Sequence, residues 1–463
     1  MSETLGRDTS HASAGELVEA LARRDVSSVE LFEAAIARIE DRDGSINAVI
    51  IHDFDRAYEA AKAADSAIAR GERRALLGLP MTVKESHNVA GLATTWGFSE
   101  AKEFRASIDS VGVQRLKTAG AVILGKTNIP VSLADWQSVN PVYGRTSNPW
   151  DVTRTAGGSS GGAAAALAAG MVPLEFGSDI GGSIRVPAAF CGVYGHKPSY
   201  NLVPQRGHAP PGLDGGDAPI AVLGPLAVTA DDLALALDVL AGPVGDEATG
   251  YLLDLPSPRH AALSDYSVLM LDHHPLAALD KEVKQALTDL ADHLDRQGAT
   301  VARRSSLLPD LESAHQVYLG ILGVAMSRGG PSRPDALSAH AWLDLLDAQV
   351  SVRRQWAELF KTFDVVLAPV FGTTAFEHLD EPDPTQRTLL INGKSTAYFD
   401  QLAWSGMATL AHLPATSAPI GASVAGLPIG VQIIGPYLED RMTIEFARLL
   451  EREFGRPARA WDT

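Results

Sequence analysis

Short apolar runs separated by helical segments constrain the fold of this chain more than any other feature. The runs are LPMTV (79–83), AVIL (121–124), MVPLEF (171–176), YSVLML (266–271), DVVLAPV (364–370) and GVQIIG (430–435). Continuous apolar strands are typical of a sheet with both faces covered. Between two of the runs, Val283, Leu287, Leu290 and Leu294 recur at helical spacing. This alternation predicts an α/β fold in which helices cover a central sheet.

Helix-start signals dominate the N-terminal segment. Ser13 with Glu16, and Ser27 with Glu30, fit the reciprocal capping pattern that satisfies free N–H groups at a helix start. Each pair precedes an amphipathic stretch. Residues 1–75 are therefore expected to form a helical layer that packs on a larger body.

Two further segments could roof a pocket. Residues 307–360 are expected to be mainly helical, and the stretch 205–217, rich in Gly and Pro, is expected to be an irregular loop. Neither divides the chain, because the apolar runs on either side complete one sheet. The prediction is a single domain over residues 1–463.

The charge balance excludes some classes of partner. The chain has 56 acidic and 39 basic side chains and a net charge of −17, which repels both a phosphate backbone and an anionic membrane. No nucleic acid partner is expected, and a small-molecule substrate is favoured.

Cysteine use and the N-terminal residues point to the cytoplasm. Cys191 is the only cysteine, so an intramolecular disulfide is impossible. The N-terminal segment lacks the basic start and apolar stretch of a secretion signal. The most apolar run, 163–174, is shorter than the roughly 20 residues that span a bilayer. We therefore expect a cytoplasmic protein with no membrane segment.

The segment 155–194 is the most informative for function, because it contains two glycine-rich turns. The first, 157–162, leads into an alanine-rich helix, and the second, 177–183, follows an apolar strand. Such turns let backbone N–H groups converge on developing negative charge. The spacings of a phosphate-binding loop, a Rossmann turn and a Gly-x-Ser-x-Gly elbow are all absent. A flexible linker is disfavoured by the strand and helix around the turns.

A serine nucleophile in the second turn would need a base and preplaced donors for an oxyanion. The donors are available in the backbone N–H groups of Ile180, Gly181, Gly182 and Ser183. No base is evident nearby. Three histidines are candidates for this role, but they are scattered in the sequence, and each taken singly is expected to be structural or solvated: His87, His196 and His208.

Several ordered motifs resemble the amidase signature family. They are GLPMTVKES, GKTNIP, YGRTSNPWD, GGSSGG, GSDIGGSIRVPAAFCGVYGHKP, DVVLAPV and GLPIGVQIIGP. The resemblance implies a central mixed sheet with helices on both faces. It places the signature core, with the catalytic triad, at 76–205. Residues 300–400 resemble nothing we can place and are expected to set substrate specificity.

The resemblance also implies a Ser-Ser-Lys triad. Ser183 would be the nucleophile, Ser159 the bridging serine after a cis peptide bond, and Lys84 the base. Lysine accepts a proton only when neutral, and its ordinary pKa is about 10.4. Burial at the end of the strand 79–83 would lower that pKa. No metal or organic cofactor is required.

Residues near the triad receive supporting roles from the same resemblance. Asp179 and Arg185 would brace the nucleophile turn by hydrogen bonds. Ser160 would cap the alanine-rich helix or brace Lys84, and capping is favoured. Departures from the usual family pattern stand where substrate is expected, so a substrate pocket is assigned to Trp96, Trp136 and Gln137.

The expected function is hydrolysis of a carboxylic acid amide through an acyl-Ser183 intermediate. Aryl or short aliphatic amides are the favoured substrates. Esters and carbamates would also fit an acyl-serine route, so a urethane (carbamate) hydrolase is one alternative. A second alternative is the glutamine-hydrolysing A subunit of a tRNA-dependent amidotransferase. A third is a nitrilase-type site of Cys191, Glu85 and Lys84, which is disfavoured. A homodimer stays open.

Overall fold

The computed structural model describes residues 9–328, 330, 336–456 and 460 of the chain. At its centre lies an eleven-stranded mixed sheet. In spatial order its strands are β1 (Val49–His52), β3 (Val122–Thr127), β2 (Pro80–Lys84), β8 (Leu174–Asp179), β10 (Val222–Ala227), β9 (Tyr194–Lys197), β16 (Ala415–Ala422), β17 (Pro428–Ile434), β13 (Val365–Pro369), β11 (Ser267–Met270) and β12 (Thr300–Ala302). All six apolar runs predicted as strands contribute one strand each to this sheet, so the α/β prediction is confirmed.

Helices cover both faces of the sheet, as expected. Alternate residues of β3 show the two sides: Ile123 belongs to one buried cluster, while Val122 and Leu124 belong to another. The first side carries α1 (Ala14–Arg23), α4 (Val111–Thr118), α7 (Ala230–Leu240), α9 (Lys281–Arg296) and α13 (Asp440–Phe454). The second carries α5 (Gly161–Ala168) and α6 (Arg185–Cys191). The four apolar residues predicted to form one helix face are all buried in α9.

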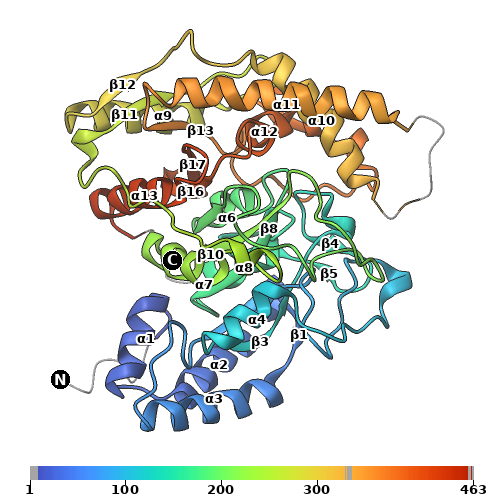
Figure 1. Ribbon diagram of the computed structural model, residues 1–463, viewed down its shortest axis with the longest axis vertical. Helices are drawn as coiled ribbons and strands as arrows, with labels where there is room; N and C mark the ends of the chain where they lie inside the picture. Colours follow the sequence, from blue (N-terminus) through green and yellow to red (C-terminus); the bar gives the residue numbers. More distant parts are fainter. Residues whose placement is uncertain (1–8, 329, 331–335, 457–459, 461–463) are drawn as a thin grey trace.

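The remaining long helices lie at the two ends of the fold. Figure 1 places α2 (Ser28–Ile46) and α3 (Phe54–Ala69) with α1 at one end, and α10 (Leu311–Met326) and α11 (Ala339–Leu359) at the other. Helix α12 (Leu402–Leu410) packs against α10. Residues 307–360 are thus mainly helical where described, and 205–217 contain neither helix nor strand, as predicted.

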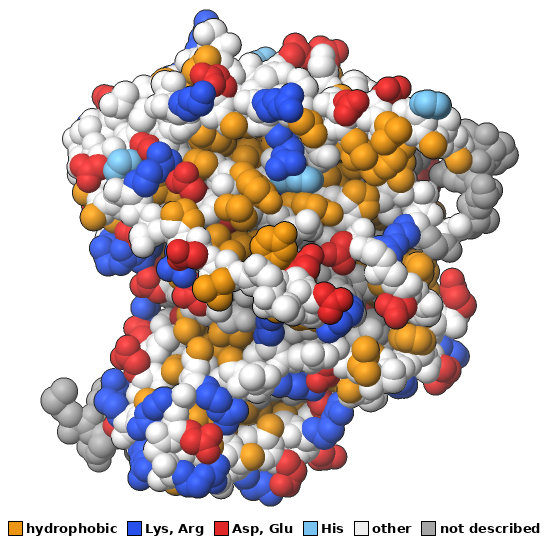
Figure 2. Space-filling view, in the orientation of Figure 1, with side chains coloured by type: hydrophobic (Ala, Val, Ile, Leu, Met, Phe, Trp, Pro, Cys, Tyr) orange, Lys and Arg blue, Asp and Glu red, His pale blue; other side chains and the backbone are white. Residues whose placement is uncertain are grey.

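Shorter elements complete the chain. Three two-stranded ribbons are formed by β4 (Val139–Asn140) with β5 (Gly144–Arg145), β6 (Ser147–Asn148) with β7 (Asp151–Thr155), and β14 (Thr388–Ile391) with β15 (Lys394–Ala397). Helix α8 is one short turn (Glu247–Gly250). Figure 2 shows acidic and basic side chains interspersed over one face of the molecule, with apolar side chains gathered in the half that contains α11.

The N-terminal layer is not wholly helical, which corrects the expectation for residues 1–75. Both capping boxes form, at Ser13 with Glu16 and at Ser27 with Glu30. After α2, however, the chain enters β1, which pairs antiparallel with β3 at one edge of the sheet. The run Val49–His52 starts with β-branched residues, which favour a strand. No helix in the described part of the chain is long and apolar enough to cross a membrane.

Candidate active site

Three segments bring the predicted triad residues to one edge of the sheet. Lys84 is the last residue of β2, and Ser183 follows the end of β8, the parallel neighbour of β2. Parallel strands end at the same edge, which is where ligands bind in α/β sheets. Ser159 lies in the turn before α5, and its peptide bond to Gly158 is cis, as the resemblance implied.

Lys84 is fully buried beside two serine hydroxyls. Its Nζ lies 2.6 Å from Ser159 Oγ and 2.9 Å from Ser178 Oγ. Burial lowers the pKa of Lys84 to about 7, although the carboxyl groups of Asp179 and Glu175 act in the opposite direction. A neutral amine is therefore well populated near pH 7, and its lone pair can accept the Ser159 proton.

Ser178 is a site residue that sequence reasoning missed. Its position in the sequence gives no sign of this role, because Ser178 reaches Lys84 only through the pairing of β8 with β2. Ser160 also differs from expectation: it is the N-cap residue of α5, yet its side chain makes no capping hydrogen bond. Instead Ser160 Oγ donates to the Ser178 carbonyl at 3.4 Å, so it supports the partner of Lys84.

Asp179 and Arg185 form a buried ion pair that shapes the nucleophile turn. Arg185 Nη2 donates to Asp179 Oδ1 at 2.8 Å, and the same carboxylate accepts the N–H groups of Gly182 and Ile184. Burial alone would raise the pKa of Asp179, but the Arg185 guanidinium outweighs it and lowers that pKa to about 2. The carboxylate therefore stays ionised and holds the turn around Ser183.

One of the four backbone N–H groups predicted to bind an oxyanion is already engaged in a hydrogen bond. The N–H of Gly182 is used by Asp179, which departs from the predicted set. The N–H groups of Ile180, Gly181 and Ser183 have no hydrogen-bond partner among the described residues. Gly182 has φ +92°, and a Cβ there would lie 2.8 Å from Val186 Cγ2, so glycine is required at this position.

Two aromatic side chains fix the carbonyl side of the same turn. The indole N–H of Trp136 donates to the Gly181 carbonyl at 2.9 Å, and the Tyr318 hydroxyl donates to the Ile180 carbonyl at 2.9 Å. Tyr318 lies on α10, within the region that was expected to set substrate specificity. The Ile180 carbonyl shares its peptide plane with the Gly181 N–H, so the Tyr318 bond orients a candidate oxyanion donor. The Gly181 carbonyl shares its plane with the Gly182 N–H, so the Trp136 bond supports the contact between Gly182 and Asp179.

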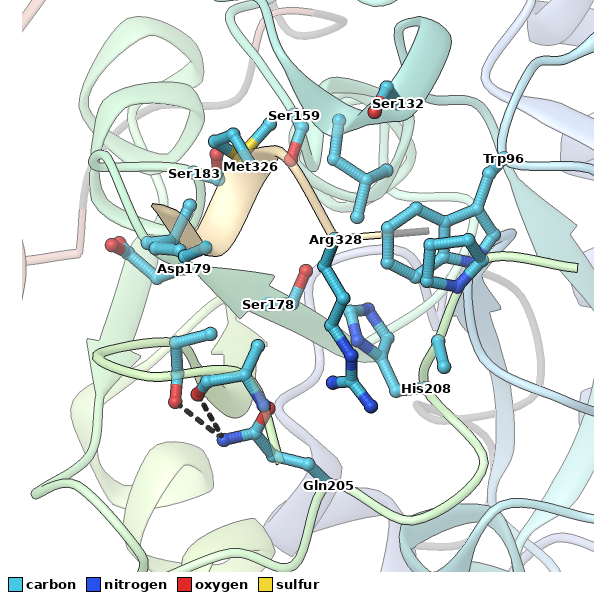
Figure 3. Close-up of a pocket in the computed structure, with 17 residues that line it drawn as sticks. Trp96, Ser132, Ser159, Ser178, Asp179, Ser183, Gln205, His208, Met326 and Arg328 are labelled. Carbon is cyan, nitrogen blue, oxygen red and sulfur yellow. Dashed lines mark hydrogen bonds between the residues drawn. The ribbon is translucent and has the colours of Figure 1, made fainter. Parts of the chain in front are cut away.

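A cavity that opens to solvent lies over these groups and is lined by Ser159, Ser178 and Ser183. Figure 3 shows the three serines with Trp96 at one side. Trp96, one of the three residues assigned to a substrate pocket, lines the cavity. Trp136 and Gln137 do not: Trp136 packs behind the nucleophile turn, and Gln137 donates to the Leu379 carbonyl.

The roof of the cavity comes from the two segments proposed for it. The lining is completed by residues of the 205–217 loop, of the C-terminal end of α10 and of the segment just after it, namely Gln205, His208, Ala209, Pro210, Ala325, Met326 and Arg328. The other lining residues are Ser132, Leu133, Asp179, Ile180, Ala218 and Ala221. Helix α11 contributes nothing to this lining, so only part of 300–400 faces the site.

The three histidines considered in the sequence have different surroundings. His87 stacks on Phe176 with ring centroids 4.0 Å apart, and His196 is buried beside Asp440. His208 lines the cavity, with Nε2 2.9 Å from Ser86 Oγ. Burial lowers the pKa of His208 to about 3, so this ring is neutral near pH 7.

The nitrilase-type arrangement does not form. Cys191 is buried at the end of α6, where its thiol donates to the Ala156 carbonyl, and burial raises its pKa well above the usual range. Glu85 accepts the N–H groups of Thr95 and Trp96. Neither Cys191 nor Glu85 lines the cavity. Among the residues described, no three His, Cys, Asp or Glu side chains gather as a metal site.

Comparison with protein families identifies the chain. The family model named Amidase matches residues 30–329 and 329–444. The chain belongs to the amidase signature family. Its mixed sheet with helices on both faces is therefore the fold of that family, as the motifs indicated.

Individual members of the amidase signature family match over nearly the whole chain. The A subunit of glutamyl-tRNA(Gln) amidotransferase from Anaeromyxobacter sp. (strain K) is 33% identical, covering 94% of each chain. A solved vestigial protein complex, which bears on the evolutionary origins of an s-triazine catabolic enzyme, contains a chain that is 30% identical with a TM-score of 0.81, covering 96% of this chain and 99% of that one. A bacterial aryl acylamidase is 26% identical with a TM-score of 0.82, covering 97% of each.

Proposed function

We propose that this chain hydrolyses a carboxylic acid amide to an acid and an amine or ammonia, through an acyl-Ser183 intermediate. The observation that carries the proposal is the fully buried Lys84, whose Nζ lies 2.6 Å from Ser159 Oγ and whose pKa burial lowers to about 7. Ser159 and Ser183 line the same cavity. The proposed relay and nucleophile thus face one space that a substrate can enter, and the proposed base lies behind the relay.

The proposed reaction is acyl transfer in two halves. Neutral Lys84 takes the Ser159 proton while Ser159 takes that of Ser183, whose Oγ attacks the carbonyl carbon and forms the C–O bond. The free N–H groups of Ile180, Gly181 and Ser183 are the candidate donors to the oxyanion. The C–N bond then breaks, the relay returns the proton to the departing nitrogen, and water hydrolyses the ester by the same steps.

Substrate binding has a part in completing this relay. Ser183 Oγ has no hydrogen-bond partner among the described residues, whereas Ser159 Oγ is already held by Lys84. Catalytic hydrogen bonds are often long without substrate and tighten in the complex. We propose that the Ser159–Ser183 contact forms when a carbonyl occupies the cavity.

A substrate panel with mass spectrometry tests this function. The purified chain, without partners, is offered aryl amides, aliphatic amides, esters and urethanes, and the intact mass is followed after mixing. We expect amide hydrolysis and a transient acyl mass on the peptide that contains Ser183. An adduct on another residue, or hydrolysis without any adduct under acyl-trapping conditions, would contradict the mechanism.

The rate is expected to depend on pH through Lys84. Because the base is the neutral amine and the pKa of Lys84 is lowered to about 7, kcat/KM should rise about tenfold per pH unit below that value and level off above it. Asp179, with a pKa of about 2, stays ionised throughout. The measurement is kcat/KM from pH 5.5 to 9, with circular dichroism at each pH.

A second buried group titrates in the same window and needs its own control. Burial raises the pKa of Glu175 to about 7, and the Glu175 carboxyl group accepts a hydrogen bond from the Thr82 hydroxyl. In Glu175→Gln the rise with pH should persist, since the amide keeps the hydrogen bond but cannot ionise. A profile that becomes flat in this variant would assign the titration to Glu175 instead.

The A subunit of a tRNA-dependent amidotransferase is the second candidate, supported by relatives of that name with 33% identity over 94% of both chains. It predicts glutamine hydrolysis that depends on partner chains, whereas the proposed amidase acts alone on simple amides. A urethane hydrolase is separated from both by the carbamates in the panel. The single domain, the cytoplasmic location and the homodimer stay predictions.

A further inference from the structure

The cavity over the serines is mostly uncharged, apart from one side chain. Asp179 is paired with Arg185, and the neutral His208 ring is bonded to Ser86. The Gln205 side chain is also committed, because its amide group donates to the Ala218 and Ala221 carbonyls. These partners leave none of the three side chains available to bind a charged group of a substrate.

Arg328 is different. It lies two residues beyond the end of α10, is partly buried, and lines the cavity, yet its guanidinium forms no ion pair or hydrogen bond within the described part of the chain. In Figure 3 its side chain reaches across the cavity between Ser178 and His208, with Ser159 and Ser183 on one side and Gln205 on the other.

Structural roles do not account for this placement. Asp217 interacts electrostatically with Arg328 but forms no ion pair with it. Arg328 stands between this cavity and a neighbouring hollow and lines both, whereas Asp217 lines only the hollow. The end of α10 is closed by backbone bonds, from Ser327 N–H to the Gly323 and Val324 carbonyls. The guanidinium is therefore not needed to cap the helix.

We propose that Arg328 binds a carboxylate carried by the substrate, so that the enzyme prefers amides that also bear an acidic group. This inference rests on the proposed amide hydrolysis at Ser183. A guanidinium presents a planar fork of N–H donors that matches a carboxylate, and apolar walls strengthen such a pair. Since the chain has a net charge of −17, an anion gains little from the overall field and depends on a local cation.

Paired substrates test the charge preference. The first series compares acyl para-nitroanilides of increasing chain length with the same chains ending in a carboxylate. The second compares anilides that carry a carboxylate or a methyl group on the amine ring. For at least one pair we expect wild type to favour the acid, and Arg328→Met to lower the acid-to-neutral ratio of kcat/KM by about 10- to 100-fold. Arg328→Lys should retain part of the ratio.

The control is Arg206→Met, which removes an exposed arginine from the neighbouring hollow. It should leave the acid-to-neutral ratio unchanged. The proposal is overturned if wild type favours no acid in either series, or if the preference survives in Arg328→Met. Loss of the proposed function gives a different pattern: either no amide is hydrolysed, or hydrolysis with an unchanged charge preference persists in Ser183→Ala.

Discussion

Replacing Ser183 with alanine is expected to lower kcat for amide hydrolysis by about 10⁴-fold or more, because it removes the oxygen that forms the acyl bond in the proposed mechanism. The effect on folding should be small. Ser183 is nearly buried, its side chain has no hydrogen-bond partner among the described residues, and the turn is held by Asp179 and Arg185. Initial rates and thermal unfolding of the two proteins make the comparison.

The outcome also separates binding from chemistry. Since Ser183→Ala keeps the cavity and the free N–H groups, it should still bind substrate with an affinity near that of wild type, which calorimetry can measure. The matched control is Cys191→Ala, which removes the only thiol, a group outside the cavity. It should retain activity within about threefold. Residual turnover above about 1% in Ser183→Ala would refute the nucleophile assignment.

The strands were predictable where apolar residues form continuous runs, and were missed where local signals conflict with the final position. β10 contains Gly224 and Pro225, residues that usually argue against a central strand. In the sheet, a Cβ at residue 224 would lie 2.2 Å from the His196 carbonyl oxygen, so glycine is needed for close approach to β9. Such a requirement arises from tertiary packing and leaves no periodic pattern in the sequence.

The same distinction between local signals and tertiary packing applies to the candidate site. Glycine-rich turns indicated an oxyanion site around Ser183 from local backbone properties alone. The partners of Lys84 could not be found that way, because Ser178 reaches it only through the pairing of β2 with β8. Trp136 was assigned to substrate on the basis of residue type, yet its indole N–H is committed to the Gly181 carbonyl. Residue type alone did not distinguish a pocket wall from a brace.

The roof shows a third limit of sequence reasoning. A loop rich in Gly and Pro and a following helical region were expected to cover a pocket, and both contribute to the lining. The part of the helical region that lines the cavity is set by the packing of α10 against α12. That packing brings Tyr318 to the Ile180 carbonyl and the C-terminal end of α10 to the cavity. Helix α10 therefore carries both a brace of the nucleophile turn, at Tyr318, and part of the cavity wall, at its C-terminal end.

Replacing Lys84 with methionine should lower kcat by about 10³-fold and abolish the rise of kcat/KM through pH 7. Methionine matches the length of the buried stem but has no proton-accepting nitrogen, and a general base contributes about 10²- to 10⁴-fold. The substitution also leaves the Ser159 and Ser178 hydroxyls without their shared partner. A buried polar group without a partner lowers the free energy of unfolding by about 1–3 kcal/mol. Lower stability alone could therefore reduce activity, and a control must separate the two effects.

Lys126→Met supplies that control. Lys126 lies on the neighbouring strand β3, is equally buried, and donates to the Ala93 carbonyl and the Thr94 hydroxyl, while burial lowers its pKa to about 8. Its replacement also removes a buried amine and leaves two acceptors without their donor. Lys126 lies outside the cavity, however. We expect similar losses of Tm in the two variants, with the large loss of kcat and the flat pH profile confined to Lys84→Met. Equal losses of kcat at matched Tm would show that Lys84 acts only through stability.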